Sequence, residues 1–139
     1  MPWSEELDEL EARSQRARQL GGADKIARQH AGGRLTVRER IDALVDAGSF
    51  HEIGAIAGSV QYDEHGNIVG YAPANCVMGR ARIDGRPVVV SGDDFTIRGG
   101  SADATIKEKA RYPEQMANEL RLPIIRLIEG SGGGGSVKT

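Results

Sequence analysis

Apolar residues recur at helical spacing through the first part of the chain. Leu7 and Leu10, with alanines and charged residues between them, predict a helix over residues 5–19 that Ser4 can cap and glycines 21–22 can end. The apolar positions are too sparse to build a core of their own. We therefore expect this helix to lie across another subunit or another domain.

Two shorter helices follow in the sequence. Asp24 begins the first, which ends at the glycine pair 32–33. Thr36 and Glu39 form a capping-box pattern that opens the second, with Val37 and Ile41 on one face. Residues 1–48 thus form a predicted helical extension, ahead of a domain that occupies 49–139.

The pattern changes from helical to extended after residue 48. Residues 50–56 are strand-like, and residues 62–67 have the composition of a turn. The clearest signal is the Asp84-Gly85 pair between the apolar runs 76–83 and 86–91, because Asp-Gly favours the tight turn of a β-hairpin.

The last third of the chain predicts a strand-helix-strand unit. Val88, Val89 and Val90 are apolar on both faces of a strand, which indicates that both faces are covered. A helix over about 103–120 follows, with Pro113 expected to kink or split it, and a strand over 123–128 returns beside its predecessor. The fold class is therefore α/β.

Composition excludes several classes of function. The chain is 39% hydrophobic with a net charge of −2, which favours a soluble globular protein over a membrane or nucleic-acid-binding one. The single cysteine, Cys76, cannot form an internal disulfide, and with His30, His51 and His65 it gives no metal-ligand spacing. We expect a cytoplasmic protein with no metal.

A first glycine-containing segment, Arg98-Gly99-Gly100-Ser101, precedes the predicted helix. Free N–H groups at a helix start, with Arg98 and the lysines at 107 and 109 nearby, favour an anion such as a phosphate. The alternative is that these residues only make a turn and cap the helix.

A second glycine run, 130–135, follows the predicted strand 123–128. Adjacent backbone N–H groups after a buried strand can hold an oxyanion without a charged side chain. Such a site needs walls on both sides, so we expect the chain to be the front piece of a larger enzyme. The alternative interpretation is a flexible linker or an engineered spacer.

Other polar groups give weaker signals. The adjacent carboxylates Asp93 and Asp94 point apart on a strand, so exposure or capping is favoured over acid–base chemistry. The three histidines have no nucleophile partner at a known spacing, which favours surface or packing roles. Arg34, Arg38 and Arg40 contact a ligand or partner, or form a solvated helical face.

Four segments carry a family resemblance, in order and at matching distances. Residues 31–41 resemble the "GKLTARERI" opening of carboxyltransferase (beta) subunits of biotin-dependent acyl-CoA carboxylases, and residues 47–52 resemble "PGSFVE". Residues 83–90 and 94–101 are similar to the "DGRPVAV" and "DFTxxGGS" of the same family, which includes propionyl-, methylcrotonyl- and acetyl-CoA carboxylases.

The resemblance implies the N-terminal part of a crotonase-like fold of stacked ββα turns, preceded by a helical extension. It implies that Arg98, Gly99, Gly100, Ser101 and Lys109 lie near the phosphates or pantetheine of coenzyme A. It also implies that the terminal glycine loop forms the oxyanion hole for the acyl group.

The register of that loop differs from the family pattern. The family reads "DSGGAR" where this chain has Glu129-Gly130-Ser131 followed by four glycines. Matching Ser-Gly-Gly gives Gly132 and Gly133 as the catalytic pair, and gap-free counting gives Ser131 and Gly132. The family's arginine is replaced, so the acyl group of the substrate stays open.

The implied activity is transfer of a carboxyl group from carboxybiotin to an acyl-CoA. The implied partners are a biotin carboxylase or biotin carrier subunit and further copies of the complete beta subunit. We expect this chain alone to be inactive and to depend on self-association or a partner for stability. The alternatives are a non-catalytic CoA-binding or assembly module and a biotin-independent enzyme of the crotonase fold.

Overall fold

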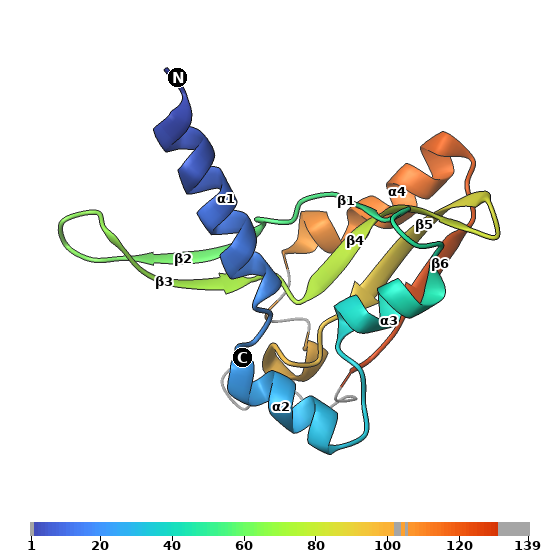
Figure 1. Ribbon diagram of the computed structural model, residues 1–139, viewed down its shortest axis with the longest axis horizontal. Coiled ribbons are helices and arrows are strands. Elements are labelled where there is room, and N and C mark those ends of the chain that lie inside the picture. Colours follow the sequence, from blue (N-terminus) through green and yellow to red (C-terminus); the bar gives the residue numbers. More distant parts are fainter. Residues whose placement is uncertain (1, 102–103, 105, 131–139) are drawn as a thin grey trace.

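A four-stranded mixed sheet organises the protein. The computed structural model describes residues 2–101, 104 and 106–130 (Figure 1). The sheet has the order β1-β4-β5-β6, from β1 (His51–Glu52), β4 (Cys76–Ile83), β5 (Arg86–Asp93) and β6 (Ile124–Leu127). β4 is antiparallel to β1 and to β5, whereas β6 runs parallel to β5. The predicted strand-helix-strand unit is confirmed.

Helices cover both faces of this sheet. On one face α3 (Val37–Leu44) buries Val37 and Ile41 against Val88 and Val90. On the other face α4 (Lys107–Leu120) packs Met116 and its neighbour Ala117 against Cys76, Met78 and Val89. The valine run of β5 is thus apolar on both sides because each side meets a helix.

Two local signals of the sequence are confirmed. The Thr36 hydroxyl accepts from the backbone N–H of Glu39, while the Glu39 carboxylate accepts from the backbone N–H of Thr36, which completes the capping box. Asp84 and Gly85 both have positive φ, 49° and 76°, as a two-residue hairpin turn between β4 and β5 requires.

The N-terminal segment differs in detail from the prediction. α1 spans Ser4–Arg18 with Trp3 at the N-cap and no side-chain cap, so the prediction that Ser4 caps the helix is wrong. α2 spans Ala23–Ala31. The N-terminal half of α1 projects from the sheet layer in Figure 1, and Leu7 and Leu10 on it are exposed.

A second, separate sheet was not expected from the sequence. β2 (Gly58–Tyr62) and β3 (Ile68–Pro73) pair antiparallel as a hairpin that extends away from the main sheet (Figure 1). Its turn lies at the predicted position, where Asp63 accepts from the backbone N–H groups of His65 and Asn67. The predicted strand over 50–56 shrinks to the two residues of β1, because Gly54 turns into the left-handed region at φ 67°.

The helix predicted over 103–120 begins later than expected. α4 starts at Lys107 and continues as one helix to Leu120, so Pro113 does not divide it. The Pro113 ring is fully buried, and its burial offsets the hydrogen bond that a proline cannot donate.

Candidate functional site

The carboxyl ends of the two parallel strands meet at one edge of the main sheet. β5 ends at Asp93, and β6 leads into Glu129. The backbone N–H of Glu129 donates to the Asp93 carboxylate at 3.2 Å, which joins the two strand ends. Ligands of open α/β sheets bind at this edge, where loops rather than strands face the solvent.

Asp94 fixes the loop that follows β5. One carboxylate oxygen accepts from the backbone N–H of Thr96 at 2.9 Å and from its hydroxyl at 2.6 Å. Burial raises the pKa of Asp94, against the lowering effect of these hydrogen bonds. The sequence favoured exposure or capping for this residue. It caps the turn, but it is buried.

The segment Arg98–Gly100 forms a short 3-10 turn instead of starting a long helix. Arg98, Gly99 and Gly100 have φ values of 49°, 60° and 71°, which an α-helix cannot accept. The N–H of Gly100 already donates to Ile97, and the N–H of Ser101 to Arg98. The prediction that this glycine pair opens a helix with free N–H groups is therefore wrong.

The Gly99-Gly100 turn nevertheless lies against the start of the second glycine run. A Cβ atom on Gly100 would come within 2.3 Å of the carbonyl oxygen of Glu129. Only a glycine permits this approach. Two segments that the sequence singled out separately thus come together at the sheet edge.

A basic hollow of about 220 Å³ opens beside this contact. Its lining includes four basic residues together with polar and aromatic ones, namely Lys25, Arg28, Gln29, Arg34, Phe95, Thr96, Arg98 and Gly99. The guanidinium of Arg34 lies over the Phe95 ring at 4.6 Å from its centre. Lys25 and Arg28 make no ion pair with any residue that the structure describes, so both can accept an anionic ligand.

A second hollow, of about 320 Å³, adjoins the first through Arg34. It is lined by Arg34, Leu35, Arg40, Ile128 and Glu129. The basic hollow and this one therefore form two neighbouring compartments, one rich in cations and one at the start of the glycine run. An elongated ligand with an anionic end fits such an arrangement.

Lys109 does not line either hollow. It is 8% exposed, and a Cβ atom on Gly54 would lie 3.7 Å from its side chain. Burial lowers the pKa of Lys109, with Cys76 and Glu52 acting in the opposite direction. The structure thus brings Arg98 and Gly99 to the basic hollow and places Lys109 elsewhere.

The catalytic glycines proposed from the sequence are not tested by the structure. Ser131, Gly132 and Gly133 lie outside the described residues. The described chain reaches Gly130, one residue past the junction of β6 with the Gly99-Gly100 turn. The assignment of the oxyanion hole stays a prediction.

Sequence reasoning missed the contribution of α2. Lys25, Arg28 and Gln29 share one side of this helix at three- and four-residue spacing, and all three line the basic hollow. The spacing was present in the sequence. The signal that was needed, the position of α2 beside the loop after β5, comes only from the fold.

The three arginines of the segment 34–40 have different environments. Arg38 donates two hydrogen bonds to Glu52 at 2.8 and 2.9 Å, and this pair ties α3 to β1. Arg40 lies 3.5 Å from Glu129, and Arg34 lies 3.6 Å from the same carboxylate. Arg34 alone among them reaches the basic hollow.

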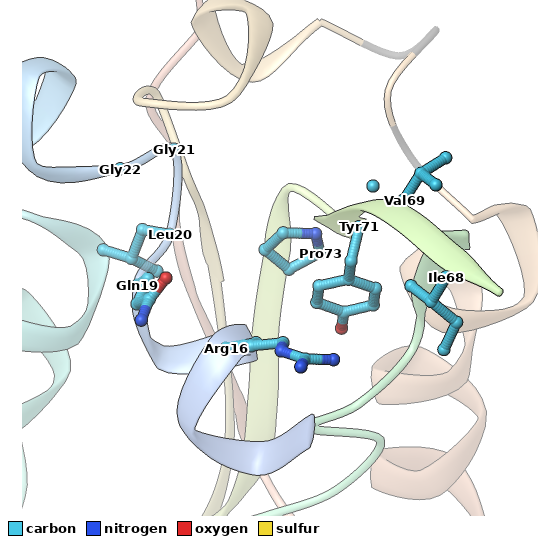
Figure 2. A pocket seen from close by; sticks show the side chains of 10 residues that line it. Arg16, Gln19, Leu20, Gly21, Gly22, Ile68, Val69, Tyr71 and Pro73 are labelled. Atoms are coloured by element: carbon cyan, nitrogen blue, oxygen red, sulfur yellow. The ribbon is translucent and has the colours of Figure 1, made fainter. Parts of the chain in front are cut away.

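A hollow larger than the basic one lies away from these residues. It measures about 450 Å³ and opens between the end of α1 and β3, where Tyr71 and Pro73 face Arg16 (Figure 2). Arg16 is its one basic residue, and no predicted site residue lines it. Its size alone does not make it a site for an anionic ligand.

No helix within the described residues is both long and apolar enough to cross a bilayer. The same residues contain no cluster of three or more histidine, cysteine or carboxylate side chains that could hold a metal ion.

Comparison with known proteins identifies the family. The model of the carboxyl transferase domain matches residues 28–138. The chain belongs to this family. It is 39% identical over 128 residues to the propionyl-CoA carboxylase beta chain of Roseobacter denitrificans, covering 91% of this chain and 25% of that protein. A carboxyltransferase subunit of propionyl-CoA carboxylase from Haloferax mediterranei is 33% identical over 95% of this chain and 26% of its own length.

Solved structures agree with the family assignment. The 12S transcarboxylase core, solved with methylmalonyl-coenzyme A and methylmalonic acid bound, superposes with a TM-score of 0.74 at 30% identity, covering 90% of this chain and 24% of that one. A single-chain long-chain acyl-CoA carboxylase gives 0.74 at 32% identity over 96% of this chain and 15% of that one. The fold is the N-terminal part of the crotonase-like carboxyltransferase fold, and the chain spans about a quarter of the curated relatives.

Proposed function

We propose that this chain supplies the coenzyme A-binding part of a biotin-dependent acyl-CoA carboxyltransferase. The observation that carries the proposal is the basic hollow beside the junction of the Gly99-Gly100 turn with Glu129. Family membership supports it, since relatives are named as carboxyltransferase subunits of acyl-CoA carboxylases.

Lys25, Arg28, Arg34 and Arg98 bind the phosphate groups in this proposal. Coenzyme A carries several phosphate charges at one end and a neutral pantetheine arm at the other. This matches a compartment with four basic residues followed by one in which Glu129 partly balances two arginines. The pantetheine arm passes Arg34 toward Glu129. The thioester then reaches the glycine run after β6.

Gly132 and Gly133 hold the oxyanion of the acyl group in this proposal, with Ser131 in the alternative register. Backbone N–H groups at that position stabilise the negative charge on the thioester oxygen in the enolate form of the acyl group. Carboxybiotin, carried by a partner subunit, is the carboxyl donor. The surface that receives it belongs to further parts of the complete subunit and to its oligomeric partners.

Titration calorimetry with coenzyme A tests the proposal on the 139-residue chain itself. Reversing two cations of the basic hollow, Lys25→Glu and Arg28→Glu together, should weaken binding at least tenfold, because each lost charge-assisted hydrogen bond is worth about 1.5–3 kcal/mol before solvent screening. The matched control is Arg80→Glu with Arg86→Glu, two exposed arginines away from the basic hollow.

The control variant should bind coenzyme A within about twofold of the parent chain, since exposed charges beyond the Debye length are screened. Equal losses in both double variants would show that only net charge matters, and would contradict the assignment of the basic hollow.

A further inference from the structure

Arg34 is shared between the two neighbouring compartments. Arg34 lines the basic hollow together with Lys25 and Arg28, and its guanidinium lies 3.6 Å from the Glu129 carboxylate. A single cation, Arg34, thus lies between the proposed phosphate site and Glu129, the residue that precedes the glycine run.

Glu129 is held at several points. Gln29, itself 3% exposed, donates to its carboxylate at 2.9 Å, and Arg40 lies 3.5 Å from the other carboxylate oxygen. The Glu129 N–H donates to Asp93, and its carbonyl packs against Gly100. Glu129 is therefore the fixed residue from which the backbone continues into Gly130.

Arg34 is the most readily displaced of the groups around this carboxylate. At 3.6 Å its ion pair is too long for a hydrogen bond, and the Arg34 side chain is 47% exposed. Gln29 is buried, and Arg40 is only 27% exposed. An anion that enters the basic hollow competes with Glu129 for Arg34 while Gln29 and Arg40 stay in place.

We propose that Arg34 couples the phosphate site to Glu129 and to the backbone at Gly130. A phosphate group in the basic hollow draws Arg34 away from Glu129 and loosens the attachment of Glu129. Without an anion, Arg34 pairs with Glu129 and strengthens that attachment. This coupling rests on the proposed function, because it requires a phosphate-bearing ligand in the basic hollow.

Linkage fixes the sign of the effect on binding. If phosphate and Glu129 compete for Arg34, removing the charge of Glu129 must strengthen phosphate binding by the same factor by which phosphate weakens the Arg34–Glu129 pair. The pair is partly exposed, so the expected gain is about two- to fivefold.

Inorganic pyrophosphate is a suitable probe, followed by amide NMR shifts of the ¹⁵N-labelled chain. Glu129→Gln should bind pyrophosphate about two- to fivefold more tightly than the parent, and in an Arg34→Gln background the same change should have no effect. The matched control is Glu114→Gln, which removes an exposed carboxylate of α4 that pairs with Arg126 of β6. It should leave the affinity unchanged.

The chemical shift of the Gly130 amide provides a second readout. It would not respond to pyrophosphate if Glu129 had a purely structural role. Pyrophosphate should shift the Gly130 amide resonance in the parent chain but not in Arg34→Gln, when the two proteins are compared at the same fraction of bound pyrophosphate. A gain in affinity for Glu129→Gln that persists without Arg34 would overturn the coupling, because it would reflect only the field of the carboxylate.

The failures of the two proposals are distinguishable. Pyrophosphate binding of equal strength in the parent and in Glu129→Gln overturns the coupling and leaves the phosphate site standing. The absence of saturable pyrophosphate shifts in the parent chain overturns the phosphate site and the coupling together.

Discussion

The hollow between α1 and β3 and the basic hollow differ in the residues that line them more than in their volumes. The one between α1 and β3 is the larger, about 450 against 220 Å³, yet it contains one basic residue and exposed apolar side chains. The smaller one gathers four cations beside a buried, hydrogen-bonded loop. Fixed polar contacts and charge, rather than volume, distinguish a site for an anionic ligand.

The same contrast holds for packing. Val89 and Val90 in β5 are completely buried, whereas Val60, Tyr62, Ile68 and Val69 in the β2–β3 hairpin remain exposed. The main sheet is covered on both faces by helices of its own chain. The hairpin lies beside α1 through β3.

The largest expected effect comes from replacing one isoleucine by alanine in each of the two regions, the main sheet and the hairpin. Ile41→Ala, at a site 1% exposed between α3 and the sheet, should lower the free energy of unfolding by about 2–5 kcal/mol because it leaves a cavity. Ile68→Ala in the hairpin, at a site 38% exposed, should lower it by less than about 1 kcal/mol. Urea denaturation followed by circular dichroism measures both. Similar losses would show that the hairpin is as tightly packed as the sheet.

A second pair of substitutions tests the contact between the two glycine segments. Gly100→Ala introduces a Cβ 2.3 Å from the Glu129 carbonyl at φ 71°, and should cost about 2–4 kcal/mol of unfolding free energy. Gly66→Ala in the hairpin turn has a similar φ of 82° but open space around it, so it should cost only about 1 kcal/mol. Thermal unfolding of the two variants measures the difference.

Equal costs for Gly66 and Gly100 would mean that backbone strain alone accounts for both. The close approach of the Gly100 turn to Glu129 would then have no energetic consequence, and the joined site at the sheet edge would lose its main structural support.

The smallest expected effect concerns Lys109 and its pH dependence. Burial lowers the pKa of Lys109 in the folded protein below its ordinary value of 10.5, so the unfolded chain binds more protons between those two values and stability rises with pH across that window. Lys109→Met has no such charge, so its free energy of unfolding should fall relative to that of the parent as the pH rises toward 10. Denaturation at pH 7, 8.5 and 10 measures this trend, and a constant difference would contradict it.

Local chemistry made much of the fold predictable, and long-range packing explains what was missed. Two of these features depend on residues close in sequence, namely the Asp84-Gly85 turn and the Thr36–Glu39 capping box. The valines of β5 were informative because an apolar run indicates a strand that is covered on both faces. The β2–β3 hairpin was missed because its strands are short and mostly exposed, so alternation is weak.

The candidate site was predictable only in part. The segment 98–101 was recognised as important, but its turn geometry depends on consecutive left-handed residues that the sequence does not reveal. Lys25, Arg28 and Gln29 join the site because α2 lies beside the loop after β5. Lys109 was assigned to the ligand through the family resemblance. The structure places it buried and outside both hollows, and its role toward a ligand stays a prediction.

The most direct test of the account is a map of amide shifts during titration of the ¹⁵N-labelled chain with coenzyme A. We predict saturable shifts concentrated at Gln29, Arg34, Arg98 and Gly99, around the basic hollow, and little change in the β2–β3 hairpin. Shifts concentrated instead at residues 19–22 and 68–71, around the larger hollow, would contradict the central claim that the basic hollow binds the phosphate groups.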